Sequence, residues 1–243
     1  MDIRPVKKLS VVIPCYNEAR SLELLVEEVL ASDIGPTQKE IIIVDDKSTD
    51  QTAEIIKQLA KKNKTIKPFF QSKNYGKGAA LQRGFQESTG SVVIVQDADR
   101  EYDPRDYSRL LQLFREDRAD IVFGSRFSGG APRRVVYLSN TIANKLMTRL
   151  SAILNGLYVS DIHTCYIMFD GNWIRQKAPR LWSKRFGFNP EIVAAIAKEK
   201  ERLRICETSV SYYGRTKSEG KKIGARDGLK AIWEIIYFNL FSS

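Results

Sequence analysis

Three acidic side chains lie within five residues in the stretch VIVQDADREYDP, which begins at Val93 with apolar residues. Side chains two residues apart in an extended segment point the same way, so Asp97 and Asp99 can offer oxygens to one hard cation. Glu101 can join them if the chain turns. Mg²⁺ and Mn²⁺ suit such ligands and usually keep waters or substrate phosphates as their remaining ligands. The stretch therefore predicts a divalent metal site.

Two other interpretations of this stretch were weighed against the metal site. A calcium-binding loop fails, because Tyr102 occupies the sixth position, where glycine is needed, and Ser108 the twelfth, where a bidentate glutamate is needed. A polar turn that caps the next helix explains Asp103 as the N-cap, with proline at the first helical position. That turn leaves the two aspartates of the DAD sequence unexplained.

A second acidic cluster, VDDKSTD, ends another apolar run at residues 44–50. Ser48, Thr49 and Asp50 are typical helix-capping residues, and capping accounts for at least one of them. It does not account for Asp45 and Asp46. A carboxylate at a strand end can accept a hydrogen bond from a base N–H or a ribose hydroxyl. One of these two aspartates is therefore a candidate for nucleoside binding.

The stretch NYGKGAALQRGF opens a helical pattern with Gly76, Lys77 and Gly78. Free N–H groups at a helix start and a lysine can meet phosphate oxygens. The spacing is not that of a P-loop, and a dinucleotide fingerprint fails because Leu81 stands where the third glycine belongs. The stretch allows phosphate contact without matching a known phosphate motif.

Apolar runs rich in β-formers alternate with helical patterns in the first half of the chain. The runs are LSVVIP, EIIIVDD, TIKPFFQ, SVVIVQD and DIVFGS. This alternation predicts an α/β fold with a mostly parallel central sheet and helices on both faces. Ligands bind beyond the carboxyl ends of the strands in such sheets. Three polar clusters, CYNEAR, DDKSTD and DADREYDP, are expected there.

Composition limits the possible partners. The chain has 243 residues, 43% of them hydrophobic, which suits one large domain. Its formal net charge of +10 favours an anionic partner: nucleic acid, an acidic membrane surface or a phosphorylated substrate. Three separated cysteines without a CxxC pair indicate neither a disulfide framework nor a zinc site, and they fit a reducing cytosol. No apolar run approaches the ~20 residues of a membrane span, so membrane contact is expected to be peripheral.

Eight motifs in order resemble the family 2 glycosyltransferases of GT-A fold, and most closely their dolichol-phosphate mannose synthase-like branch. The motifs are VVIPCYNEA, IIIVDDKSTD, KNYGKGAALQRGF, VIVQDADREYDP, GSRF, SDIHTCYIMF, GFNPEIVAAIAK and YYGRTKSEGKKIGARDGLKAIW. The resemblance covers nearly the whole chain and implies a GT-A domain over residues 1–224. It also implies a nucleotide-sugar donor, either GDP-mannose or a UDP-sugar, and a Mg²⁺ or Mn²⁺ cofactor.

The resemblance assigns the donor site residue by residue. It places the nucleoside on five positions of the first two motifs: Pro14, Tyr16, Glu18, Val44 and Asp46. It implies that Asp97, Asp99 and Glu101 hold the cation bridging the donor diphosphate, with Ala98 beside the sugar or ribose. The clustered acids are then expected to be neutralised by a divalent ion and its substrate.

Basic residues in the later motifs are implied to surround phosphates. Arg126, Arg215 and Lys221 would contact the donor and acceptor phosphates, and Arg133 or Arg134 would guide the acceptor phosphate. Arginine forks suit phosphate oxygens, whereas lysine supplies a point charge. The stretch SDIHTCYIMF departs from the family's frequent TGFK pattern, with cysteine for the glycine and isoleucine for the lysine. The resemblance therefore fixes the acceptor less firmly than the nucleotide.

The expected reaction transfers the sugar to a polyprenyl or dolichyl phosphate at the cytosolic face of a membrane, with inversion at the anomeric carbon. A phosphate nucleophile is already an anion, so positioning and electrostatic stabilisation, to which Asp99 and Arg126 contribute, would carry the rate. If a hydroxyl of a lipid, glycan or protein attacks instead, a carboxylate must accept its proton. Asp161 is the candidate for that base, and a structural turn acid is the competing interpretation.

A nucleic-acid-binding protein is an alternative from a different class, suggested by the basic balance. It predicts basic residues interleaved with aromatics on one surface and affinity that falls steeply with salt. The basic residues within the motifs of this chain lie beside acidic motifs, which would repel nucleic acid. We therefore expect no nucleic-acid partner.

The C-terminal segment, residues 225–243, is expected to form an amphipathic helix. Its apolar residues are Leu229, Ile232, Trp233, Ile236 and Leu240, widened by Tyr237, Phe238 and Phe241. Cations precede or flank it at Lys217, Lys221, Lys222, Arg226 and Lys230. The helix either closes the core or lies in an anionic membrane interface, where a lipid-linked acceptor would place its phosphate.

Overall fold

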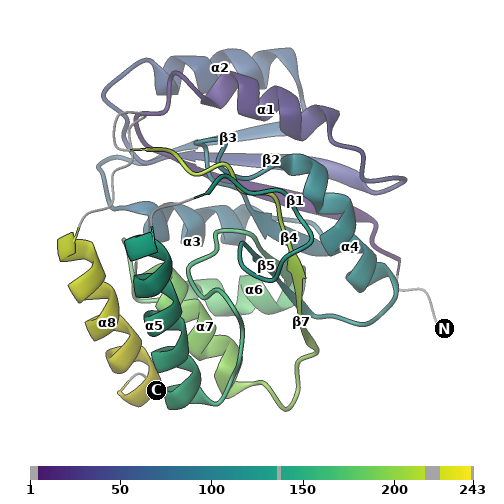
Figure 1. Cartoon of the computed structure of the whole chain (residues 1–243). Helices are drawn as coiled ribbons and strands as arrows, with labels where there is room; N and C mark the ends of the chain where they lie inside the picture. The colour runs from purple at the N-terminus through teal and green to yellow at the C-terminus, as the bar shows by residue number, and fades with distance from the viewer. Residues whose placement is uncertain (1–4, 136–137, 186, 217–224, 242–243) are drawn as a thin grey trace.

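The computed structural model describes residues 5–135, 138–185, 187–216 and 225–241. Within these ranges the strands form a seven-stranded sheet in the order β3-β2-β1-β4-β6-β5-β7 (Figure 1). The strands are β1 (Lys8–Cys15), β2 (Gln38–Asp45), β3 (Ile66–Phe70), β4 (Val92–Val95), β5 (Ile121–Ser125), β6 (Ile167–Asp170) and β7 (Ile205–Ser209). The helices are α1 (Leu22–Ala31), α2 (Thr52–Lys62), α3 (Lys77–Glu87), α4 (Tyr107–Arg115), α5 (Leu138–Asn155), α6 (Gly171–Lys177), α7 (Phe188–Lys198) and α8 (Ala225–Leu240), with 3₁₀ turns at Pro104–Asp106 and Ala178–Arg180.

The sheet is mostly parallel, as the sequence predicts. β1 runs parallel to β2 and β4, β2 to β3, and β5 to β7. In the register of the central strands Val12 lies between Ile42 and Val95. Only β6, among the strands described, runs antiparallel to both of its neighbours, β4 and β5. The carboxyl ends of β1, β2 and β4 consequently meet at one edge of the sheet.

Helices cover both faces of the sheet, and each face has its own core. Val11 and Ile13 of β1 point into the layer formed with α1, α2 and α4, whereas Val12 points into the layer with α3, α6 and α7. This alternation follows from the two-residue period of a strand. Because both faces are covered, the central strands read as continuous apolar runs rather than as alternating ones.

The loops after β1 and β2 are tied to each other. The Asn17 backbone, in the left-handed region at φ 55°, donates to the Ser48 hydroxyl at 2.9 Å, and the Asn17 side chain accepts from the Thr49 N–H at 2.8 Å. The Glu18 N–H bonds the Thr52 hydroxyl at 2.9 Å. These bonds join the clusters CYNEAR and DDKSTD into one rigid edge.

α5, α7 and α8 pack together below this edge, with α5 and α8 side by side (Figure 1). α8 buries Ile235 and Phe238 completely, so one side of this helix closes the core. None of the helices in the described ranges is long and apolar enough to cross a membrane.

A buried carboxylate, Glu40 of β2, links strands that are far apart in the sequence. It accepts hydrogen bonds from the Ser10 hydroxyl, from both the N–H and the hydroxyl of Thr89, and from the Lys67 ammonium at 2.7 Å. Burial would raise the pKa of Glu40, but these hydrogen bonds, that from Lys67 foremost, hold it down to about 2. The ionised carboxylate therefore stabilises the fold.

We predict that Glu40→Gln lowers the free energy of unfolding at pH 7 by ~1–3 kcal/mol, because a charged acceptor is lost and buried donors lose their partner. A depressed pKa gives stability that is present above the unfolded-state value and lost as pH falls toward about 2. The wild-type advantage in urea unfolding should thus shrink between pH 4.5 and 2. Glu54→Gln, at an exposed side chain, is the control. Equal stability of the two variants at pH 7 would contradict the role of Glu40.

Candidate active site

The acidic motif lies on a turn that is anchored by hydrogen bonds of the residue before it, Gln96. β4 ends at Val95, and the fully buried Gln96 accepts hydrogen bonds from the hydroxyls of Tyr107 and Tyr166. Its N–H donates to the Val12 carbonyl at 2.9 Å. Arg100 has the left-handed φ of 59°, which turns the chain within the motif. Gln96 was missed by the sequence analysis, since an amide directly behind an apolar strand carries no recognised motif.

Side-chain cations already contact the three acids. The Lys77 ammonium lies 2.5 Å from Asp97 Oδ1, and Arg215 Nη2 lies 2.7 Å from Asp99 Oδ2. The Arg215 backbone N–H donates to Glu101 Oε1 at 2.8 Å, and Arg215 Nη1 lies 3.7 Å from Glu18 Oε2. The structure thus brings three predicted site residues, Glu18, Asp99 and Glu101, around the guanidinium of a fourth, Arg215.

The acids are crowded despite these cations. Burial, and then the charges of Asp97 and Glu101, raise the pKa of Asp99 to about 7. Within the described ranges no three His, Cys, Asp or Glu residues form a ready-made metal cage. Mg²⁺ and Mn²⁺ do not need one, because they bind through one or two carboxylates plus phosphates and waters. The oxygen donors and the crowded negative charges of the motif therefore fit such an ion.

The predicted nucleoside residues lie at the edge formed by β1 and β2. Tyr16 is exposed and Pro14 is half-buried. The buried Asp46 accepts from the N–H groups of Tyr75 and Gly76, at 2.8 and 2.7 Å, so it holds the start of α3. The side chain of Val44 lies in the core, which leaves only its backbone for a ligand.

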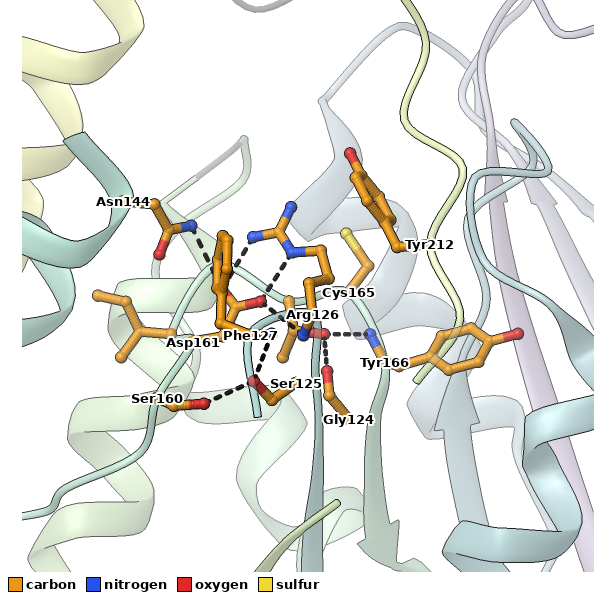
Figure 2. A network of polar contacts seen from close by, with 12 residues as sticks. Gly124, Ser125, Arg126, Phe127, Asn144, Ser160, Asp161, Cys165, Tyr166 and Tyr212 are labelled. Atoms are coloured by element: carbon orange, nitrogen blue, oxygen red, sulfur yellow. Dashed lines mark hydrogen bonds and ion pairs between the residues drawn. The ribbon is translucent and has the colours of Figure 1, made fainter. Parts of the chain in front are cut away.

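Arg126 sits in a network of polar contacts at the end of β5 (Figure 2). Its Nε and Nη2 donate to the two oxygens of Asp161 at 2.7 and 2.8 Å, in a bidentate pair. The ring of Tyr212 lies 5.0 Å from the guanidinium carbon and that of Phe127 lies 5.5 Å from it. Asn144 of α5 donates to Asp161 at 3.3 Å. The guanidinium is thus fixed between aromatic rings.

Asp161 is completely buried, and both of its oxygens are used by Arg126. Burial would raise the pKa of Asp161, but the charge and hydrogen bonds of Arg126 keep it below its usual value. This placement favours the structural interpretation of Asp161 over the role of a base that a substrate hydroxyl could reach. The sequence analysis did not find Asn144, because the amide lies within an otherwise ordinary helical pattern.

Arg133 and Arg134 lie beside this network and are exposed. Arg133 Nη1 donates to the Arg126 carbonyl at 3.3 Å, and its guanidinium lies over the ring of Phe127. The Arg134 N–H donates to the Tyr212 carbonyl at 2.8 Å. The structure therefore brings Arg133 close to Arg126. Lys221 lies outside the described residues.

Tyr212 joins the two parts of the site. Its hydroxyl donates to Glu101 Oε2 at 2.8 Å, while its ring faces the Arg126 guanidinium. Isolated bridges pair its backbone with Tyr102 and Arg133. The motif YYGRTKSEGK carried this residue, but nothing in the motif distinguishes Tyr212 from the tyrosine after it.

Comparison with known proteins assigns the family. The model of glycosyl transferase family 2 matches residues 10–176, more than half of the chain. The chain belongs to this family. The matched range contains the acidic motif and the Arg126–Asp161 pair, so the family resemblance read from the motifs is confirmed.

Curated relatives point to the same family. The chain is 36% identical over 160 residues to an undecaprenyl-phosphate 4-deoxy-4-formamido-L-arabinose transferase from Photorhabdus laumondii, covering 65% of this chain and 49% of that protein. It is 42% identical over 113 residues to the transferase of the same name from Pectobacterium carotovorum, covering 45% of this chain and 34% of that protein. The chain thus spans half or less of the length of these relatives.

Solved structures share the GT-A fold, which confirms the predicted fold class. A glucosyl-3-phosphoglycerate synthase from Mycobacterium tuberculosis, crystallised with Mn²⁺, UDP and phosphoglyceric acid, matches with TM-score 0.68 and 18% identity over 98% of this chain and 80% of that one. A mannosyl-3-phosphoglycerate synthase from Rubrobacter xylanophilus matches with TM-score 0.71 and 16% identity over 96% of this chain and 72% of that one.

We predict that Asp161→Asn destabilises the protein by about 3–5 kcal/mol, because it leaves the buried Arg126 charge without its partner. Urea unfolding at pH 7 measures the loss. Asp117→Asn is the matched control, because Asp117 pairs with Arg204 on the surface, where an ion pair contributes about 0–1 kcal/mol. Similar small losses in both variants would show that Arg126 does not depend on Asp161.

Proposed function

We propose that the chain is a metal-dependent, inverting glycosyltransferase that moves a sugar from a nucleotide-sugar donor to a polyprenyl phosphate. The observation that carries this proposal is the Arg126–Asp161 pair beside the acidic motif, because it holds a guanidinium ready for phosphate next to the proposed donor site. The names of the curated relatives, which are undecaprenyl-phosphate transferases, support a lipid phosphate as the acceptor.

Arg126 would orient the acceptor phosphate. Asp161 engages Nε and Nη2, so Nη1 can face a phosphate oxygen, and Figure 2 shows that nitrogen pointing away from Asp161. A guanidinium held by a carboxylate and two rings loses little freedom on binding, which favours a fixed position for the nucleophile. Arg133 extends the positive charge toward solvent and would guide the phosphate inward.

Asp97 and Asp99 would hold the divalent cation, with Glu101 next to them. The bound cation supplies charge neutralisation for the diphosphate that leaves the sugar. Mn²⁺ in a neighbour of the same fold, crystallised with UDP, supports Mn²⁺ or Mg²⁺ and a nucleoside diphosphate here. Arg215 lies 2.7 Å from Asp99 and is placed to contact the same phosphates, with Lys221 as a further candidate from the sequence.

A phosphate acceptor also agrees with the burial of Asp161, the candidate base of this network. The phosphate oxygen is an anion at neutral pH and attacks the anomeric carbon directly, from the face opposite the leaving diphosphate, which inverts the configuration. A hydroxyl acceptor would need a carboxylate to take its proton, and Asp161 is buried against Arg126. We therefore favour the lipid phosphate over a hydroxyl acceptor, and we propose that the basic charge serves phosphates rather than nucleic acid.

We predict that Asp97→Asn or Asp99→Asn lowers Mn²⁺- or Mg²⁺-dependent sugar transfer by orders of magnitude, because a neutral amide is a poor ligand for a hard cation. Transfer from a labelled nucleotide sugar to polyprenyl phosphate measures the effect, and thermal unfolding checks the fold. Asp103→Asn keeps an N-cap residue in the same acidic stretch and should retain activity. Full activity in excess chelator would refute metal dependence.

A membrane surface is the second partner that we propose. α5 turns polar side chains, Asn144, Thr148 and Ser151, into the protein. Its exposed side carries apolar residues instead: Leu138, Ile142, Leu146 and Ile153. Met147, Leu150 and Leu154 of the same helix pack against the core, so α5 is apolar on both sides, and its exposed apolar residues mark an interaction surface rather than a solvated helix.

The neighbouring helix α8 has the same character. Ile235 and Phe238 face the core, while Trp233 and Leu240 are exposed, so the two expectations for this helix are compatible. We name the exposed apolar residues of both helices the α5/α8 face: Leu138, Ile142, Leu146, Ile153, Ile232, Trp233, Ile236 and Leu240. Exposed cations flank it at Lys145, Arg149 and Lys230. Apolar residues with cations favour the interface of an anionic bilayer, at the depth of a lipid phosphate, on the cytosolic face.

We predict that the protein binds phosphatidylglycerol vesicles in a sedimentation assay, and that added salt weakens this binding. The pair of changes Ile153→Asp and Trp233→Asp should abolish it without lowering the melting temperature, because both side chains are exposed. Leu24→Asp, at an equally exposed apolar residue of α1, is the control and should bind normally. Failure of the wild type to bind vesicles, or equal loss with Leu24→Asp, would contradict the membrane assignment.

A further inference from the structure

Lys77, the first residue of α3, contacts the acidic motif. Its ammonium lies 2.5 Å from Asp97 Oδ1 and 3.2 Å from Cys165 Sγ, and the side chain is only 21% exposed. A charged ammonium therefore occupies a carboxylate oxygen that the donor's cation would use.

The backbone on both sides of Lys77 is held rigidly. Gly76 has a φ of 103°, and a Cβ there would lie 2.4 Å from the Lys184 carbonyl oxygen. A Cβ at Gly78 would lie 2.2 Å from the Ser183 carbonyl oxygen. Asp46 holds the Gly76 N–H from the other side. The backbone next to Lys77 is therefore closely packed, and the long side chain is the part that would carry the ammonium away from Asp97.

The charges around the motif show what this ammonium does. Within the described residues, Lys77 pairs with Asp97, and Arg215 pairs with Glu18, Asp99 and Glu101. The Lys77 ammonium thus occupies the same carboxylate that is proposed to hold the divalent cation. Like charges at contact distance repel strongly in a partly buried site, so ammonium and divalent ion compete for Asp97.

We propose that Lys77 is an internal counterion that competes with the divalent cation for Asp97, so that the cation binds weakly until a diphosphate draws the ammonium away. This inference rests on the proposed function, which supplies the diphosphate. Lys77 would regulate how tightly the divalent cation binds at that site. The lysine side chain moves from a carboxylate to a phosphate, with no bond made or broken. Lys77 acts here as a positioning residue for the metal ligand.

The competition makes binding of cation and nucleotide cooperative. A diphosphate that accepts the Lys77 ammonium frees Asp97 for the cation, and the cation in turn strengthens diphosphate binding by the same factor. Structural damage lowers affinities, whereas removal of a competing charge raises one of them. An increase in cation affinity is thus a specific signature of this role.

Titration of Mn²⁺, followed by the electron paramagnetic resonance of free Mn²⁺, tests the proposal on the full chain. We expect Lys77→Met to bind Mn²⁺ about tenfold more tightly than the wild type without nucleotide, a difference of ~1.4 kcal/mol. UDP or GDP should raise the Mn²⁺ affinity of the wild type and raise that of Lys77→Met much less. Lys77→Arg keeps the charge and should retain the weak wild-type affinity.

Lys73→Met is the matched control, because it removes an exposed lysine four residues away that lies over the ring of Tyr75. Equal Mn²⁺ affinity of the wild type and Lys77→Met, or the same gain in Lys73→Met, would overturn the proposal. If Lys77→Met binds Mn²⁺ more tightly but neither nucleotide affects any variant, the counterion role stands and the proposed nucleotide donor fails.

Discussion

Mutual repulsion of carboxylates at one edge of the sheet is the constraint on which the arrangement of the site depends. The parallel strands β1 and β4 end side by side, which brings Glu18 into the same region as Asp99 and Glu101. Such acids stay ionised together only when cations lie among them, because otherwise one of them takes up a proton. α3 supplies Lys77, and the segment after β7 supplies Arg215, so distant parts of the chain meet at this edge.

The network around Arg126 is also held together by neutralisation of charge, but there the central charge is positive. Arg126 is a largely buried cation, and Asp161 is the buried acid that neutralises it. Tyr212 connects the parts, because its hydroxyl reaches Glu101 and its ring lies against Arg126. A phosphate binding to Arg126 would therefore lie near the acids that are proposed to hold the donor. This geometry would let the proposed donor and acceptor phosphates lie side by side.

The sequence predicted the helices and strands better than it predicted which of them, and which side chains, contact one another. Strand ends, helix starts and the acidic motif are local patterns, and the parallel sheet followed from their alternation. The antiparallel direction of β6 did not, because a strand of only four residues carries no information about direction. The contact of Lys77 with Asp97, twenty residues later, depends on the loop geometry around Gly76. The apolar residues on the exposed side of α5 were also hidden, because periodicity does not reveal which side of a helix faces the protein.

The central claim is that sugar transfer ends on a lipid phosphate. Incubation of the protein and Mn²⁺ with a panel of labelled nucleotide sugars and polyprenyl phosphate, followed by analysis of the product, tests it most directly. The account predicts an acid-labile, lipid-linked sugar whose anomeric configuration is opposite to that of the donor. Transfer to the dephosphorylated polyprenol, or an acid-stable product with retained configuration, would contradict it.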